Sequence, residues 1–452
     1  MRFVLIVAIM LVGFVWQQPV AAAQKPDDQW IGTWGYVSAP PPPGVTPPAS
    51  GPPSAQLYTP FGAVTVQPPR PFPALLLDNP GHVAIDAAPS DLVNLTVRQV
   101  VRVSVGGKQL RLRFSNEGGV DPLILADVHV AAAGANGAIV AGSDHVVQFG
   151  GKQGVAIPAG APALSDPIDL ATKALETLYV SIYLPGPTPS RASRTLYQYV
   201  AGEPGDFAGA AELPKVRLMR APSLLTLVEV QPTKPTSVVV ALGDSITEGA
   251  ASTANAFRSW PDRLAERLAE RNWAVVNAGI SGNRLLRYGA GPNAPARLDR
   301  DVLSVPGVKV IILLEGINDI GRGFTPAGNT EPITLSGLQA ADMQIIARAH
   351  EHGIRVIGAT LTPYQGAAYA SSEGESVRGA LNQWIKNSGV FDGVIDFAPA
   401  VADHDNPLTF GKAYNDWDHL HPNDAGYKAM ADAIDLSLIT GAAASGRAAA
   451  AR

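Results

Sequence analysis

Three residue types that cooperate in nucleophilic catalysis occur in two short segments of the chain. Ser245 lies in the segment Gly-Asp-Ser-Ile-Thr, and Asp418 and His421 lie three positions apart in Asp-His-Leu-His-Pro. A reactive serine needs a base within hydrogen-bond reach and a third group that fixes the tautomer of that base. The spacing predicts that Asp418 holds Nδ1 of His421 while Nε2 faces Ser245. Taken alone, the serine segment is weak evidence, because these residues are common in turns and helix caps.

Acyl transfer also needs hydrogen-bond donors aimed at the negatively charged oxygen of the intermediate. Asn318, in the segment Gly-Ile-Asn-Asp, offers a side-chain amide. Gly282 offers a backbone N–H that no side chain obstructs. Both residue types are also frequent in turns after strands. They are therefore candidate oxyanion donors whose assignment depends on the rest of the site.

Two other interpretations of the histidine segment stay open. Asp418, His419, His421 and Asp424 are all potential metal ligands. No further histidine or cysteine cluster follows another predicted strand, which disfavours a metal site. His421 can also be a structural histidine with satisfied hydrogen bonds. We favour the catalytic interpretation and expect neither a metal nor a cofactor.

The elements that must position these residues alternate between strands and helices. Apolar runs predict five strands, at 237–242, 273–279, 308–316, 354–362 and 393–399, with helical patterns between them. A final helix is expected from Pro422 to about Ile439. This alternation predicts an α/β fold with a parallel sheet covered on both faces. The candidate residues all follow strands, and the carboxyl ends of strands are where sites form in such sheets.

The first half of the chain has a different pattern. Between Val83 and Val230, short valine-rich runs are separated by glycine, asparagine, aspartate and proline. This spacing is typical of antiparallel strands in a sandwich or barrel. The proline-rich stretch at 39–53 is expected to be an extended loop between strands. The length of 452 residues also favours two domains over one.

The N-terminal segment predicts export. Arg2 precedes an apolar region from Phe3 to Val15, and Ala21 and Ala23 suit a signal-peptidase site, so cleavage is expected before Gln24. A membrane anchor is the alternative, but the apolar region is shorter than the roughly 20 residues that a span needs. The expected location is therefore secreted or periplasmic, without a membrane span after cleavage.

The composition limits the partners and the sources of stability. The chain contains no cysteine, so it must be stable without disulfides. Its formal net charge of −5 offers no cationic face for nucleic acid or an anionic membrane. We therefore expect a small-molecule or polysaccharide ester as the substrate, and no nucleic acid partner.

Four segments in fixed order resemble the SGNH or GDSL hydrolase family. They are Gly243–Gly249 (GDSITEG), Asn277–Arg284 (NAGISGNR), Gly316–Asp319 (GIND) and Asp418–Pro422 (DHLHP), and the resemblance covers about residues 235–439. It implies a flavodoxin-like, three-layer hydrolase domain. His419 stands where relatives often carry glycine, which leaves the Asp-to-His spacing intact and affects only the shape of the loop. The β-rich first half also resembles that of larger secreted members, without transferring any residue.

The resemblance also implies a role for each candidate residue. Ser245 would be the nucleophile, His421 the general base and Asp418 its orienting carboxylate. The N–H groups of Ser245 and Gly282 and the side chain of Asn318 would form the oxyanion hole. The expected organisation is a signal peptide at 1–23, a β-rich domain at 24–234, a hydrolase domain at 235–440 and a disordered tail at 441–452.

These observations together predict a secreted serine esterase. The segments at 321–332, 364–374 and 406–417 are polar to aromatic and unlike the aliphatic lid of a lipase, which favours short acyl groups. Larger secreted relatives are often associated with plant polysaccharide deacetylation, so an acetylated glycan is a candidate substrate. Two alternatives stay open: an acyltransferase with the same triad, and a glycan-binding protein with a non-catalytic hydrolase-like half.

Overall fold

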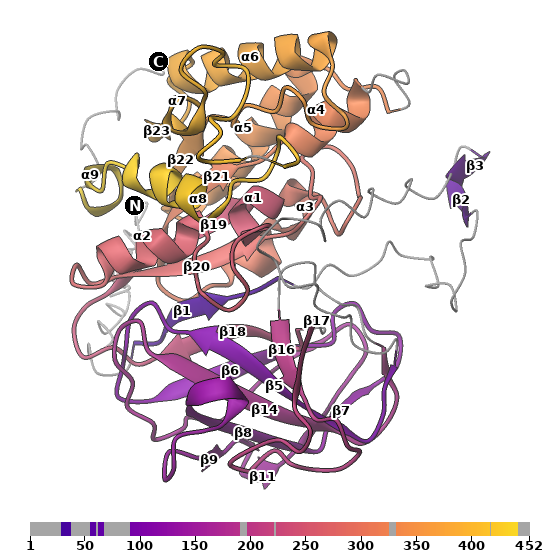
Figure 1. Cartoon of the computed structure of the whole chain (residues 1–452), viewed down its shortest axis with the longest axis vertical. Helices are drawn as coiled ribbons and strands as arrows, with labels where there is room; N and C mark the ends of the chain where they lie inside the picture. Colours follow the sequence, from indigo (N-terminus) through magenta and orange to yellow (C-terminus); the bar gives the residue numbers. More distant parts are fainter. Residues whose placement is uncertain are drawn as a thin grey trace, which may run out of the picture.

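The computed structural model describes residues 29–37, 55–59, 62–66, 91–189, 197–220, 223–324, 331–415 and 417–441. The predicted signal peptide, the proline-rich loop and all of the predicted tail except Gly441 lie outside these residues. Figure 1 shows a strand-rich half, here called the β-rich half (up to residue 234), against a mixed half, the α/β half (from residue 235). Within the described residues, no helix is both long and apolar enough to span a bilayer.

The α/β half is built on a parallel sheet of five strands. These are β19 (Ser237–Gly243), β20 (Trp273–Gly279), β21 (Val308–Leu314), β22 (Arg355–Ala359) and β23 (Gly393–Ile395). Their spatial order is β20-β19-β21-β22-β23, which is the 2-1-3-4-5 order of flavodoxin-like folds. Each predicted strand is present, and the predicted α/β fold class is confirmed. The order places the strand that leads to Ser245 between two neighbours.

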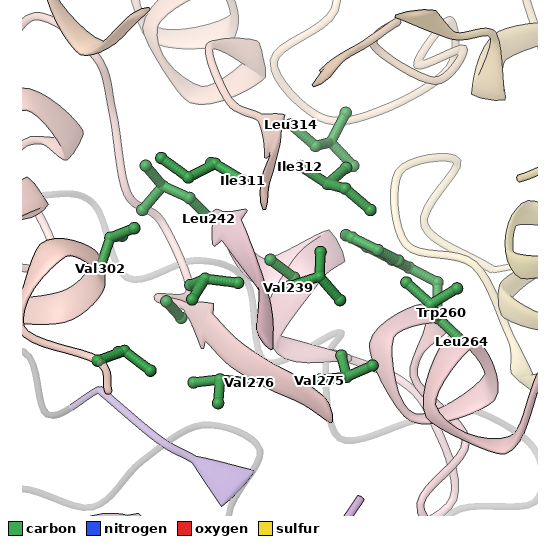
Figure 2. Close-up of a cluster of buried hydrophobic side chains, with 14 of the residues drawn as sticks. Val239, Leu242, Trp260, Leu264, Val275, Val276, Val302, Ile311, Ile312 and Leu314 are labelled. Carbon is green, nitrogen blue, oxygen red and sulfur yellow. The ribbon is translucent and has the colours of Figure 1, made fainter. Parts of the chain in front are cut away.

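Helices cover both faces of this sheet. They are α1 (Ser245–Glu248), α2 (Trp260–Leu268), α3 (Ala294–Leu298), α4 (Ile317–Gly323), α5 (Leu335–Glu351), α6 (Ser372–Asn387), α7 (Phe397–Val401), α8 (Asp424–Asp432) and α9 (Ser437–Thr440), with a π-helical turn at Asp299–Leu303. Side chains alternate along each strand, so both faces are apolar. Figure 2 shows Val239 on the side of Trp260 and Leu264, and Leu242 and Ile311 on the side of Val302.

The prediction of one continuous final helix to Ile439 is wrong. Helix α8 ends at Asp432, and the short helix α9 begins at Ser437. The guanidinium of Arg267, on α2, donates to the carbonyls of Ala431 and Ile434, which therefore do not need helical partners. The carboxylate of Asp435 then accepts from the N–H of Ser437 at 2.9 Å, which favours a new helix start.

The β-rich half contains two larger antiparallel sheets. One has the order β1-β18-β6-β13, and the other β17-β16-β5-β14-β8-β9. Their buried valines, leucines and isoleucines belong to one core, as the predicted sandwich requires. The strands of the first are Ile31–Gly35, Leu225–Val230, Leu110–Ser115 and Pro162–Leu164; those of the second are Arg217–Arg220, Tyr197–Val200, Leu95–Arg102, Thr177–Leu184, Asp127–Ala132 and His145–Val146.

The described residues of this half also form four two-stranded pairs. They are β12 (Val155–Ile157) with β7 (Leu123–Leu125), β10 (Gln148–Phe149) with β11 (Lys152–Gln153), β15 (Thr188–Pro189) with β4 (Asp91–Leu92), and β2 (Ala55–Thr59) with β3 (Gly62–Val66). Among the described residues of this half, a 3-10 turn lies at Ala135–Gly137.

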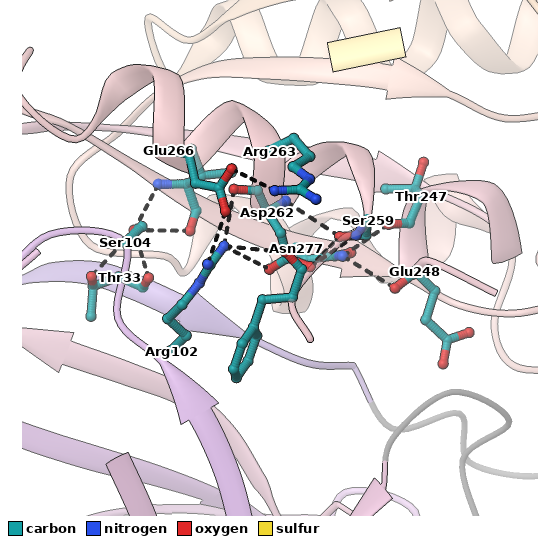
Figure 3. A network of polar contacts seen from close by, with 12 residues as sticks. Thr33, Arg102, Ser104, Thr247, Glu248, Ser259, Asp262, Arg263, Glu266 and Asn277 are labelled. Carbon is teal, nitrogen blue, oxygen red and sulfur yellow. Dashed lines mark hydrogen bonds and ion pairs between the residues drawn. The ribbon is translucent and has the colours of Figure 1, made fainter. Parts of the chain in front are cut away.

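Strand β1 joins the two halves by packing on β20, an edge strand of the parallel sheet. A Cβ on Gly35 would lie 2.5 Å from a methyl group of Val276, so glycine at this position allows the close approach. The hydroxyl of Ser104 accepts from the N–H of Val275 at 2.9 Å. Figure 3 shows these polar contacts between the halves. The β-rich half therefore covers an edge that would otherwise carry an unpaired N–H group.

Candidate active site

Ser245 lies at the carboxyl end of β19, as the first residue of α1. The turn that delivers it needs glycine at 243, because a Cβ there would lie 2.4 Å from the carbonyl oxygen of Leu314. Asp244 caps α1 by accepting from the N–H of Ile246 at 2.9 Å. The first N–H groups of a helix have no partner within the helix. The segment Gly-Asp-Ser thus presents a serine next to helix N–H donors.

The structure brings Ser245, His421 and Asp418 together in one hydrogen-bonded chain. Ser245 Oγ lies 2.8 Å from His421 Nε2, and His421 Nδ1 lies 2.5 Å from Asp418 Oδ2. Ser245 and His421 are both buried, at 6% and 4% exposed. A carboxylate accepts from Nδ1–H, so this geometry leaves the lone pair of Nε2 directed at the serine hydroxyl. The serine proton therefore has an acceptor in place.

The ionised form of Asp418 is favoured by its surroundings. Burial raises its pKa, but the charge of His421 and the hydrogen bonds from the side chain and N–H of His421 and from the N–H of Leu420 together hold the pKa of Asp418 below its usual value. A carboxylate that stays ionised can stabilise the imidazolium that forms when His421 takes a proton.

Asn415 organises the histidine loop, and the sequence analysis missed it. Its Nδ2 donates to Asp418 Oδ1 at 2.8 Å and to the carbonyl of His421 at 2.7 Å, and its Oδ1 accepts from the N–H of Trp417 at 3.0 Å. The indole of Trp417 stacks on the His421 ring, with centroids 6.0 Å apart and planes 21° apart. The only signal in the sequence was that Asn415 lies three positions before Asp418.

The loop departs from glycine at position 419 without losing its shape. His419 has a φ of 58°, in the left-handed region where glycine is most easily accommodated and histidine is tolerated. Its ring lies against Gly366, where a Cβ would come within 2.9 Å of His419 Cγ. The chain thus keeps the glycine-like conformation at this position and accommodates the larger side chain through a glycine elsewhere.

The predicted oxyanion residues converge on the same strand ends. Gly282 has a φ of 79° in a turn closed by the N–H of Asn283 and the carbonyl of Ile280, at 2.9 Å. Asn318 is the second residue of α4. Its Nδ2 lies 3.1 Å from the carbonyl oxygen of Asn283 and 3.3 Å from Asp244 Oδ2. Among the described residues, the N–H of Gly282 has no hydrogen-bond acceptor. Asn318 therefore connects the turn of Ser245 with that of Gly282.

Three carboxyl groups beneath the site have raised pKa values. Burial raises the pKa of Asp244 to about 7 and that of Asp319 to about 6, and it raises the pKa of Glu315 well above its usual value. Asp319 accepts from the N–H groups of Leu285 and Leu286, at 2.7 and 3.0 Å. These groups fix the loops that carry the candidate donors, in surroundings from which water is largely excluded.

Arg297 is a second residue that the sequence analysis missed. Its side chain is fully buried, and its guanidinium donates to the carbonyls of Gly243 and Ala278 at 2.9 and 2.7 Å. It also donates to Asn283 Oδ1 at 2.9 Å and forms an ion pair with Asp301 at 3.1 Å. One planar cation thus ties together the ends of β19 and β20 and the turn after β20. In the sequence, nothing about an arginine inside a short helix indicates that it will be buried and bonded to strand ends.

The four potential metal ligands of the histidine segment do not converge. Asp424 instead accepts from the side chains of Thr253 and Arg258, each at 2.7 Å. In the parts of the chain that the structure describes, no group of three or more histidines and acidic residues is arranged to hold a metal ion. Asp418 and His421 are hydrogen-bonded to each other, through Oδ2 and Nδ1.

Comparison with curated protein sequences gives no match. Solved structures do resemble part of the chain. A G-D-S-L family lipolytic protein from Desulfitobacterium hafniense is 26% identical, with 44% of this chain and 97% of that chain covered and a TM-score of 0.33. A GDSL-like lipase from Bacteroides thetaiotaomicron is 18% identical, with 47% and 93% covered and a TM-score of 0.35. An acetyl xylan esterase is 20% identical, with 43% and 96% covered and a TM-score of 0.34.

The family assignment comes from the sequence of the α/β half. The model of the GDSL-like Lipase/Acylhydrolase family matches residues 241–429, a range that contains all the candidate site residues. Membership of an acylhydrolase family implies hydrolase activity. Residues 241–429 of this chain belong to the GDSL-like lipase/acylhydrolase family.

Proposed function

We propose that the protein is a secreted or periplasmic serine esterase that hydrolyses short-chain carboxylic esters. The observation that carries this proposal is the hydrogen-bonded chain from Ser245 Oγ through His421 to Asp418, with spacings of 2.8 and 2.5 Å. Such a chain activates a serine for attack on a carbonyl. The location rests on the signal-like segment at residues 1–23.

In the proposed reaction, His421 Nε2 takes the proton of Ser245 as Oγ attacks the ester carbonyl. The N–H groups of Ser245 and Gly282 and the amide of Asn318 donate to the negatively charged oxygen. His421 then gives its proton to the leaving alcohol, and the acyl group stays on Ser245. Water, deprotonated by His421, attacks this acyl-enzyme, and the acid departs as the serine is reprotonated.

The segments around the site favour small acyl groups. The ring of Tyr369 lies against Gly321, where a Cβ would come within 2.2 Å of it, and the Tyr369 hydroxyl lies 3.5 Å from Asn318 Oδ1. Trp417 covers His421. Rigid aromatic groups close to the reacting atoms are the feature that favours a small acyl group in this proposal. Acetyl or aryl esters, including an acetylated plant polysaccharide, are therefore the proposed substrates.

The test compares purified protein with Ser245→Ala on p-nitrophenyl acetate, butyrate and octanoate, and on acetylated xylan by acetate release. Ser252→Ala is the matched control, because this hydroxyl donates to the carbonyl of Gly249 rather than to His421. We expect rapid cleavage of acetate and butyrate, and a loss on the order of a millionfold in Ser245→Ala. Equal rates in the wild type and Ser245→Ala would refute the proposal and favour the glycan-binding alternative.

An acyltransferase would use the same residues, so the acceptor must be tested directly. Adding glycerol or a short alcohol during turnover and analysing the products distinguishes the two reactions. Hydrolysis predicts free acid as the main product. A transferase predicts that the new ester predominates even at a low alcohol concentration.

A further inference from the structure

Glu248, the last residue of α1, is bonded to both halves of the protein. Its Oε1 accepts from the hydroxyl of Tyr36 at 3.0 Å, and its Oε2 accepts from the N–H of Ser281 at 2.6 Å. Tyr36 directly follows β1 of the β-rich half. Ser281 directly precedes Gly282, a candidate oxyanion donor. A single carboxylate therefore connects the β-rich half with the turn that carries this donor.

Glu248 belongs to the helix that carries Ser245, and this helix packs on the end of β20. Helix α1 begins at Ser245 and ends at Glu248. Asn277 Nδ2 donates to the carbonyl of Thr247 at 2.8 Å (Figure 3). A Cβ on Gly279 would lie 2.2 Å from the N–H nitrogen of Glu248, so α1 packs backbone to backbone on the end of β20. Ser245 and the Gly282 turn are thus held on either side of one tightly packed joint.

The turn at 280–283 needs such a constraint, because its central residue is a glycine with a positive φ. The hydrogen bond from the N–H of Ser281 to a carboxylate is charge-assisted and short, which makes it a strong anchor for the turn. The Tyr36 hydroxyl restricts the rotamer of that carboxylate. A misplacement of about 1 Å in a catalytic group can reduce the rate roughly a hundredfold.

We infer that Tyr36 and Glu248 are positioning residues that hold the oxyanion hole in its productive shape, so that the β-rich half takes part in the reaction. The inference rests on the proposed esterase function. Tyr36 and Glu248 also line a cavity of about 120 Å³ between the halves, together with Trp34, Tyr197 and Asn255. After removal of the Tyr36 hydroxyl, water can enter this cavity, so we expect the variant to fold.

The experiment measures kcat and KM on p-nitrophenyl acetate, and the rate at which a fluorophosphonate labels Ser245, for Tyr36→Phe, Glu248→Gln and Glu248→Ala. We expect Tyr36→Phe to lower kcat about threefold to tenfold at unchanged KM, the effect of one lost hydrogen bond. Glu248→Ala should approach the hundredfold loss of a missing oxyanion donor. Glu248→Gln keeps an oxygen for the N–H of Ser281, so it should recover most of that rate.

The matched control is Glu266→Gln. Glu266 accepts from Arg102 of the β-rich half at 3.0 Å, so it crosses the same junction without contacting the Gly282 turn. Its kcat, KM and labelling rate should equal those of the wild type, and melting curves should show all variants folded.

Unchanged labelling and kcat in the Tyr36 and Glu248 variants would overturn the inference while leaving the esterase function intact. Losses as large in Glu266→Gln would also overturn it, because any weakening of the junction would then suffice. The wild type could also be labelled by the fluorophosphonate without cleaving any ester. If labelling then falls in the Glu248 variants, the result supports the inference and refutes the esterase proposal. A wild type that neither labels nor hydrolyses would refute both.

Discussion

Replacing Arg297 with methionine should lower the free energy of unfolding by about 3–5 kcal/mol. Methionine keeps most of the volume but donates no hydrogen bond. The carbonyls of Gly243 and Ala278 and the side-chain oxygen of Asn283 would each lose a charged donor at 2.7 to 2.9 Å. Hydrogen bonds to charged groups contribute about 1.5–3 kcal/mol each, and such losses do not add fully.

Asp301 limits the size of this effect. It keeps its second partner, because Arg300 also donates to it at 2.5 and 2.9 Å, so methionine at 297 does not leave it without a cation. The loss should therefore fall in the lower part of the range. Arg297→Lys keeps the charge but not the planar fork, so lysine cannot reach all four acceptors and should fall between methionine and the wild type.

Urea unfolding followed by tryptophan fluorescence and by circular dichroism measures this prediction. Lys215→Ala is the control. Lys215 forms an ion pair with Glu203, and the two side chains are 76% and 46% exposed. Such exposed ion pairs contribute little to the free energy of unfolding. A loss below about 1 kcal/mol in Arg297→Met, with an unchanged dependence on urea, would show that the buried cation is not needed to hold these strand ends.

Two further predictions concern the turns on either side of the site. Burial raises the pKa of Asp244 from 3.8 to about 7, so ionisation is disfavoured in the folded state and Asp244 makes the wild type less stable as the pH rises from about 4 to about 7. Urea unfolding at pH 4 and pH 8 measures the free energy of unfolding of Asp244→Asn and of the wild type. The stability of the variant relative to the wild type should increase with pH, by at most about 4 kcal/mol. A difference that does not depend on pH would contradict the raised pKa. Gly282→Ala should lower stability by about 1–2 kcal/mol and also lower kcat, because φ is 79° and the new methyl group would lie 3.1 Å from Ala290 Cβ. Adding Ala290→Gly relieves the contact but not the backbone strain, so full recovery in the double variant would mean that crowding alone was responsible.

The strands of the parallel sheet could be predicted because buried parallel strands are continuous apolar runs. β19, from Ser237 to Gly243, matches its predicted start and ends one residue later than predicted. β22 ends at Ala359, three residues before its predicted end, because β23 ends at Ile395 and the N–H of Leu361 donates to Asn382 Oδ1 at 2.7 Å instead of to a strand. The break after Asp432 could not be predicted, since it depends on Arg267 from a helix far away in sequence.

Some residues of the candidate site could likewise be predicted from the sequence, and others could not. Ser245, Asp418 and His421 could be found because their chemistry demands particular residue types near strand ends, and the structure brings them together. Their catalytic roles stay predictions. Arg297 and Asn415 contact mainly backbone carbonyls and amides, and any residue type offers those groups. Residues that hold the backbone in place therefore leave no pattern that spacing can reveal.

The position of β1 has a consequence for the order in which the chain can fold. β1 precedes both of its neighbours in the chain by a long distance: these are β18, which ends the β-rich half, and β20, which belongs to the next half. Contacts between such distant segments form late, because a long loop must close first. One side of β1 therefore stays uncovered until β20, the second strand of the α/β half, has been made.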